Sequence, residues 1–335
     1  MNESAVIKDA LQHVVLVEID CEKGEGPELA KKYGVGGYPT YIAVNGDGQI
    51  SDSIIGYPGA EGWASFAKST TIDRRTIEAK TAAYAEKPTA TLARSLGNRA
   101  STGYDFKGAV GYFHKARELD PDNAAEFTEQ ILTNMYYGSY GGAFTIDEVE
   151  AEVKPAFNAP DADTGDKLQL AEMMTQAAKS TGVPERAASY LKAALAAPVD
   201  PSDENHVRSR DRLAVDAALI IDKDEDKAVA LVRASYDEGW DETPRGLNRF
   251  AWWCFENRVN MDEGLALALM GADLAEDDRS RARILDTVAE ICNALGNCGK
   301  AVDYIKQAVE LQPDSQSYKD QLARFEKLLA EQTQG

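Results

Sequence analysis

The order of apolar and polar residues predicts strands mixed with helices at the start of the chain. Val14 to Ile19 is a nearly continuous apolar run, typical of a strand buried on both faces of a sheet. Thr40 to Val44 and Gln49 to Gly56 have the composition of strands, and Asn45-Gly46-Asp47-Gly48 between them is a strong hairpin signal. Apolar residues follow a helical spacing in the ranges 3–12, 27–33 and 60–69.

Beyond a helical connector at 71–86, the pattern becomes that of paired helices rich in alanine. Apolar and small residues recur at about 34 residues, the period of a helix-turn-helix repeat. The clearest unit begins near Ala282, turns at Gly296 and ends at Pro313. Similar units begin near Ala90 and Ala171. Degenerate units are expected at 213–235 and 247–274, a closing helix at 311–332, and loops or breaks at 134–165 and 198–206.

The charge of the chain excludes several classes of partner. The net charge is −20 and the pI is near 4.6, which disfavours nucleic acid, because its binding depends on neutralising phosphates with Lys and Arg. The same charge disfavours an anionic membrane surface. No run of about eighteen apolar residues occurs, so we expect no membrane insertion. The first residues, Met1 to Asp9, lack the basic start and apolar core of a signal peptide.

One stretch carries a family resemblance. The sequence from Lys32 to Ile50 contains Gly36-Gly37-Tyr38-Pro39-Thr40, an apolar strand and the Asn-Gly-Asp-Gly turn. It resembles the cis-proline half of the thioredoxin fold, and the likeness extends over 5–68. The repeats resemble tetratricopeptide repeats. Leu-Asn-x-x-Ala-Trp at 247–252 and Leu-Asp-Thr-Val-Ala at 285–289 resemble helical repeats appended to bacterial thioredoxin-like proteins.

The resemblance implies a fold in two parts. We expect an α/β thioredoxin-like domain over residues 1–70, a helical connector over 71–88 and an all-α tetratricopeptide-type solenoid over 89–335. The thioredoxin-like domain is expected to be incomplete. The strand that approaches the reactive cysteines in that family would lie between the strands at 14–19 and 40–44 and is not found, as if the chain began after it.

The cysteines do not form the Cys-x-x-Cys motif of thioredoxins. They are Cys21, Cys254, Cys292 and Cys298, and no two have that spacing. Cys21 lies between two acidic residues, which disfavour a thiolate, so we expect an inert thiol. Cys254 and Cys292 are expected to pack in the helical core, and Cys298 to lie outside disulfide reach of Cys292.

The resemblance places a peptide-binding edge at Tyr38, Pro39 and Thr40, where thioredoxin-like proteins offer backbone groups to an extended peptide. The alternative is that Pro39 only shapes a turn. A second candidate is the concave face of the best repeat, formed by Arg283, Asp286, Glu290 and Asn293. These four residues would grip a partner's peptide, or they form an ordinary solvated face, which we favour.

The remaining aromatic residues and the histidines give weaker predictions of a binding site. Tyr136, Tyr137 and Tyr140 would form an aromatic surface patch or pack onto the next repeat, and the second alternative is favoured. The histidines His13, His114 and His206 are scattered, so we expect no metal site, and no cofactor motif is present.

The resemblance implies thiol–disulfide exchange on protein or peptide clients held by the repeats, in a full-length form that carries the missing cysteines. The alternative is a non-catalytic adaptor for protein–protein interaction. A signal preceding Met1 would indicate a periplasmic or exported protein, and its absence a cytoplasmic one.

Overall fold

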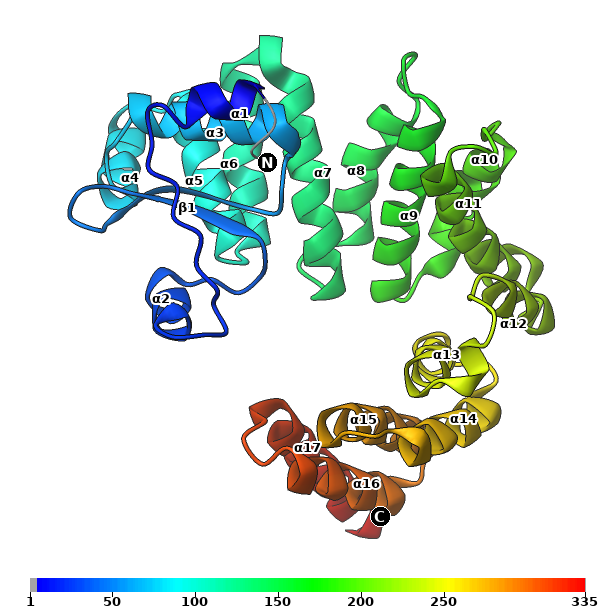
Figure 1. Ribbon diagram of the computed structural model, residues 1–335. Coiled ribbons are helices and arrows are strands. Elements are labelled where there is room, and N and C mark those ends of the chain that lie inside the picture. Colours follow the sequence, from blue (N-terminus) through cyan, green and yellow to red (C-terminus); the bar gives the residue numbers. More distant parts are fainter. Residues whose placement is uncertain (1–4, 335) are drawn as a thin grey trace. The chain divides into compact units, whose positions relative to one another are not determined.

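The computed structural model describes residues 5–334, and the chain divides into two compact units, Met1–Ala194 and Leu195–Gly335. Most described residues are helical, and the strands form one two-stranded antiparallel sheet (Figure 1). This agrees with the predicted helical array. The predicted domain boundaries at 70 and 88 both fall inside the first unit. Within residues 5–334, none of the helices combines the length and apolar content needed to cross a bilayer.

The predicted hairpin is present in the first unit. It consists of β1 (Thr40–Val44) and β2 (Ile50–Ile55), in antiparallel register with Thr40 opposite Ile55. A bulge precedes Val44, and the Asn-Gly-Asp-Gly sequence makes the turn.

Three helices accompany the hairpin: α1 (Ala5–Ala10), α2 (Gly26–Tyr33) and α3 (Gly59–Ile72). They confirm the helices predicted in the first 70 residues. α1 packs on α3, where Ile7 and Trp63 are buried in a small apolar cluster.

The predicted strand at 14–19 is wrong. This segment has no regular secondary structure, and Val15 and Val17 are 91% and 67% exposed. A strand needs a hydrogen-bonded neighbour, and the sheet described for residues 5–334 contains only β1 and β2. The apolar run therefore has the composition of a buried strand without the partner that would bury it.

The rest of the first unit is helical, and α10 ends just beyond it. Its helices are α4 (Ile77–Glu86), α5 (Ala90–Thr102), α6 (Phe106–Leu119), α7 (Ala124–Tyr140), α8 (Ile146–Phe157), α9 (Thr164–Ser180) and α10 (Ala188–Ala196), with 3-10 turns at Pro121–Asn123 and Pro184–Ala187.

The break predicted over 134–165 is mostly wrong, because α7 continues to Tyr140 and α8 begins at Ile146. Gly138, near the end of α7, allows close packing against Phe106 and Phe144. Thr145 then caps α8 through a reciprocal bond pair with Glu148.

All the regular elements described in the second unit are helices or helical turns. They are α11 (Glu204–Ala217), a π-helical turn (Ala218–Asp222), α12 (Glu225–Ala234), a 3-10 turn (Trp240–Glu242), α13 (Pro244–Asn257), α14 (Met261–Leu274), α15 (Asp278–Ala294), α16 (Cys298–Leu311) and α17 (Gln316–Gln334). The units predicted at 213–235, 247–274 and 282–313 each correspond to one helix pair. The loop predicted at 198–206 is found up to the start of α11 at Glu204.

Small residues let paired helices approach closely. α5 packs closely on α6 at Gly97, where an added Cβ would lie 2.9 Å from the ring of Phe113. That ring is fully buried and has no room to move. By contrast, a Cβ added at Gly111 on α6 would meet no atom within 4 Å.

We therefore expect Gly97→Ala and Gly111→Ala to change stability in opposite directions. Gly97→Ala should lower the free energy of unfolding by about 1–3 kcal/mol through overpacking. Gly111→Ala should raise it by about 0.5–1 kcal/mol, because Ala restricts the unfolded chain and favours helix. Urea unfolding followed by circular dichroism measures both. Equal effects of the two variants would contradict close packing at Gly97.

Candidate peptide-binding edge

The corner before β1 holds the three residues predicted as a peptide-binding edge. The Tyr38–Pro39 bond is cis, and Tyr38 is 66% exposed. The Thr40 hydroxyl donates a hydrogen bond to the carbonyl of Gly37 at 2.6 Å, and the Gly56 N–H donates to the Pro39 carbonyl at 2.8 Å. These bonds fix the corner, leaving Tyr38 and Pro39 at the surface and Thr40 half-buried.

One edge of β1 is available for pairing. In an antiparallel pair, hydrogen-bonded and non-bonded residue positions alternate. Pro39 and Gly56 form a hydrogen-bonded pair, so the alternate residues Thr40 and Ile42 are in non-bonded positions. Their backbone N–H and C=O groups therefore point away from β2. Across residues 5–334, no strand pairs with that side of β1.

The segment that was expected to be a strand runs beside β1. Figure 1 shows it as the dark-blue trace between α1 and α2. Val14 packs in the cluster that contains Tyr41. Burial raises the pKa of the Tyr41 hydroxyl, and the Glu18 carboxylate adds to the shift. Desolvation also raises the pKa of the Tyr38 hydroxyl, and the nearby Cys21 thiol adds to that shift. The segment therefore comes close to β1 at Tyr41 and close to the prolyl corner at Tyr38.

This segment exposes an unusual amount of apolar surface. Its exposed residues are Val15, Leu16, Val17 and Ile19, with exposed fractions from 44% to 91%. In the part of the chain that the structure describes, the backbones of residues 14–19 form no hydrogen bond with another backbone group. The segment and the β1 edge thus combine unpaired backbone with apolar side chains, the two features that an added strand needs.

Two glycines allow the corner to pack closely against the turn between α5 and α6. A Cβ added at Gly36 would lie 2.6 Å from the ring of Tyr104, and one added at Gly37 would lie 2.5 Å from the Tyr104 hydroxyl. Tyr104 ends the α5–α6 turn with a φ of +62°, a conformation that non-glycine residues rarely adopt. The glycine pair that the sequence motif contains therefore makes room for this ring.

A buried charged cluster attaches β2 to the helices. The ammonium Nζ of Lys80, on α4, donates to the Ser51 carbonyl at 2.7 Å and to the Ser95 Oγ at 2.9 Å. It also lies 3.5 Å from the Asp52 carboxylate. Lys80 and Asp52 are both almost fully buried. Burial raises the pKa of Asp52, and the attraction of Lys80 opposes that shift only in part. Neither Lys80 nor Ser95 was identified from the sequence, where a single lysine in a short helix resembles a surface residue.

The cysteines supply no reactive pair. All four are free thiols, and Cys254, Cys292 and Cys298 are buried. Burial raises the pKa of Cys254 to about 12 and also raises the pKa of Cys292. Cys21, at the prolyl corner, is the partly exposed one. Among the described residues, no group of three His, Cys, Asp or Glu side chains has the arrangement of a metal site.

The second predicted site, on α15, is partly covered by α17. The Glu290 carboxylate accepts hydrogen bonds from the Gln321 amide, at 2.6 Å, and from Arg324. Asp286 is also largely buried and lies against Gln321. The sequence could not show this, because the closing helix was expected only to cover the end of the array. The other two predicted residues differ: Arg283 is exposed, and Asn293 accepts a hydrogen bond from the Cys298 thiol at 3.6 Å.

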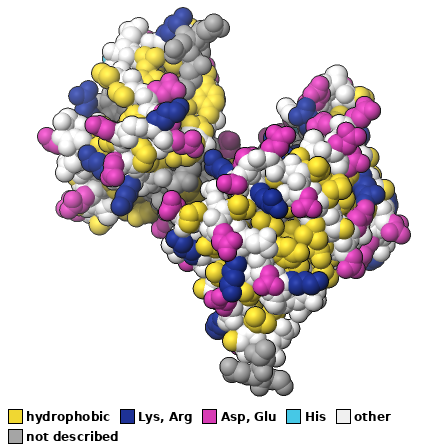
Figure 2. Space-filling model, turned by 60° about the horizontal axis from the view of Figure 1, so that its bottom comes forward, with side chains coloured by type: hydrophobic (Ala, Val, Ile, Leu, Met, Phe, Trp, Pro, Cys, Tyr) yellow, Lys and Arg dark blue, Asp and Glu magenta, His cyan; other side chains and the backbone are white. Residues whose placement is uncertain are grey.

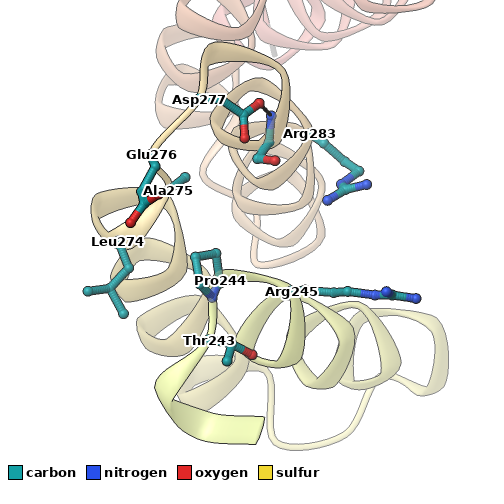
Figure 3. A pocket seen from close by; sticks show the side chains of 9 residues that line it. Thr243, Pro244, Arg245, Leu274, Ala275, Glu276, Asp277 and Arg283 are labelled. Carbon is teal, nitrogen blue, oxygen red and sulfur yellow. Dashed lines mark hydrogen bonds between the residues drawn. The ribbon is translucent and has the colours of Figure 1, made fainter.

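Arg283 lines a cavity of about 300 Å³ in the second unit. The cavity lies between the first turns of α13 and α15, and Figure 3 shows the Arg283 and Arg245 side chains extending to the same side. The cavity is also lined by Glu276 and Asp277, and the Asp277 carboxylate accepts the Ser280 N–H at 2.8 Å as a helix cap. Charges of both signs are therefore balanced there, and we assign no ligand to it.

The wider surface agrees with the charge argument. In Figure 2, Lys and Arg side chains lie interspersed with Asp and Glu on the visible face rather than gathered into one basic field. No protein-family model matches this chain, and comparison with curated proteins finds no match. The function must therefore be argued from the geometry of the chain itself.

The buried cluster predicts a large effect of Lys80→Met. The substitution leaves the Asp52 carboxylate buried without its cation, which should lower the free energy of unfolding by about 3–5 kcal/mol. Replacing both partners, as Lys80→Met with Asp52→Val, should recover part of this loss. Lys115→Met, which removes an exposed ion pair with Glu118, is the control and should change stability by less than about 1 kcal/mol. A Lys80→Met variant as stable as the control in urea unfolding would contradict the anchoring role.

The α15–α17 contact predicts a pH dependence. Burial raises the pKa of Asp286 from 3.8 to about 6. The folded chain then holds this proton more tightly than the unfolded chain does, so the stabilisation is complete below about pH 4 and is lost as the pH rises through 6. The Asp286→Asn variant has no carboxyl group to titrate at this position. Over this pH range its free energy of unfolding should therefore fall by about 1–2 kcal/mol less than that of the unchanged protein. Urea unfolding of both proteins between pH 4 and 7 measures the difference, and identical pH profiles would show that Asp286 titrates alike in both states.

Proposed function

We propose that this protein is a thioredoxin-like protein with tetratricopeptide-type repeats that binds protein clients, and that the edge of β1 receives an extended segment of the client. The observation that carries the proposal is the unpaired β1 edge beside the exposed apolar residues of 14–19. Strand addition gains main-chain hydrogen bonds from the edge and side-chain contacts from the apolar residues.

The charges around the edge indicate the kind of client segment. Glu18, Asp20 and Glu22 border the apolar residues. Among residues 5–334, Asp20 is the one of these three that forms an ion pair, with Lys23 at 2.9 Å. An extended apolar segment flanked by basic residues complements this surface. Electrostatic matching of this kind mainly increases the rate of association and the specificity.

The paired helices support the same function in a second way. α5 with α6, α13 with α14 and α15 with α16 pack as hairpins of similar length. Stacked helix pairs of this kind offer extended surfaces for protein partners. The cysteines of this chain provide no dithiol, so the proposal assigns it client binding and no redox step.

The proposal predicts that binding depends on the peptide backbone. A fluorescently labelled peptide of alternating Val and Thr with a Lys at each end should bind to the full chain in an anisotropy titration. The same peptide with alternate backbone nitrogens methylated should bind at least about tenfold more weakly, since each lost hydrogen bond costs about 1 kcal/mol. Equal binding of the two peptides would rule out strand addition.

A matched pair of variants locates the site. Val17→Glu, at a residue that is 67% exposed, should weaken binding of the unmethylated peptide. Ile72→Glu, at a residue of α3 that is 79% exposed, should leave it unchanged.

A further inference from the structure

A row of aromatic side chains continues from the prolyl corner onto α7. We call it the aromatic strip, and it consists of Tyr104, Phe106, Tyr137, Tyr136 and Tyr140. Successive rings along this order have centroids 5.7, 6.5, 5.3 and 5.4 Å apart. Tyr104, Tyr137 and Tyr140 are 47%, 56% and 58% exposed. The tyrosines of α7 therefore form a surface patch, and the favoured sequence prediction that they pack onto the next repeat is wrong.

The backbone beside the aromatic strip leaves room for its rings to pack together. Gly138 lies on α7 between the tyrosines, and a Cβ there would come within 3.0 Å of the Phe106 Cβ and 2.5 Å of the Phe144 ring. Its absence lets Phe106 reach the helix and stack on Tyr137, with 24° between the ring planes. The Tyr136 and Tyr140 hydroxyls are hydrogen-bonded to each other at 2.8 Å.

The strip is continuous with the proposed peptide-binding edge. The Tyr104 ring lies on Gly36 and Gly37, which directly precede the exposed Tyr38. Charged side chains at its border are engaged with other groups: Asp105 caps α6 at the Gly108 N–H, and Lys107 lies 3.8 Å from Glu148. The surface itself offers ring faces and hydroxyl groups.

We propose that the aromatic strip binds a proline-rich segment of the client in a polyproline II conformation, an assignment that rests on the proposed function. The rings of the strip contact one another, so a ligand would lie on their exposed faces rather than between them. A polyproline II helix presents proline rings along its length, and aromatic surfaces are the usual receptors for such segments. The carbonyls of such a helix have no internal hydrogen bonds, so an exposed hydroxyl such as that of Tyr137 can donate to them.

A carbohydrate also stacks on aromatic rings, but the structure favours a peptide. The strip leads directly to a β edge with unpaired backbone groups, and only a polypeptide can use both surfaces. Tyr136 and Tyr140 lie four residues apart on one face of α7, and their rings are neighbours along the helix.

The test is an anisotropy titration of the full chain with fluorescein-labelled decaproline. Tyr137→Ala should weaken binding of decaproline about tenfold, because stacked aromatic contacts of this kind are strong for their size. Trp252→Ala, at an exposed aromatic residue of α13, is the control and should leave binding unchanged. Circular dichroism of each variant confirms that the fold is retained. A labelled glycine–serine decapeptide should not bind.

The outcomes separate the two proposals. Binding of the Val/Thr peptide without binding of decaproline overturns this inference and leaves the proposed function intact. Decaproline binding that is unaffected by Tyr137→Ala also overturns it. If maltoheptaose binds instead and loses affinity in Tyr137→Ala, the strip is a carbohydrate site and the peptide assignment is wrong. Absence of binding by both peptides refutes the proposed function together with the inference.

Discussion

The first unit depends on a lysine ammonium group buried between the hairpin and the helices. A two-stranded hairpin is marginally stable by itself, so it needs a surface to pack on. Ser51, Asp52 and Ser53 of β2 are all buried, a polar set rather than the apolar set usual for a packed strand. Lys80 compensates by giving its donors to the Ser51 carbonyl, the Asp52 carboxylate and the Ser95 hydroxyl. A polar contact of this kind needs donors and acceptors at matching positions. It therefore specifies the position of the hairpin on the helices as well as stabilising it there.

The second contact between hairpin and helices is steric and lies at the corner. Gly36 and Gly37 belong to the stretch that resembles the thioredoxin fold, and the Tyr104 ring occupies the space that their missing side chains leave. The buried lysine fixes β2 from one side, and the tyrosine fixes the approach to β1 from another. The unpaired edge of β1 is therefore held in place at two points, although the hairpin has only two strands.

The sequence predicted most of this fold because its local signals are strong. The hairpin turn, the proline-initiated α2 and the small-residue spacing of α5–α6 and α15–α16 each specify their elements within a few residues. The failures have a common cause, which is that burial depends on contacts distant in sequence. Val14 to Ile19 has strand composition but no strand beside it, and the one glycine of α7, Gly138, serves close packing rather than a loop.

The candidate sites show the same limit. Tyr38 and Pro39 were found because a local motif places them at a corner. Lys80, Ser95 and Tyr104 were missed because their roles exist only once α4, α5 and the hairpin meet. Asp286 and Glu290 were placed on an open face because the contact with α17 cannot be read from helical periodicity.

The rigidity of the corner bears directly on how a client could be held. Binding an extended segment costs free energy for ordering the receptor as well as the ligand. Here the Tyr104 ring belongs to both the corner and the aromatic strip, so the two surfaces are positioned relative to each other before a ligand arrives. A segment that pairs with β1 thereby brings its continuation to the strip at a high effective concentration. Two contacts that are each weak would then act as one binding site, and the glycine pair that permits the Tyr104 contact becomes a requirement of that coupling as much as of the fold.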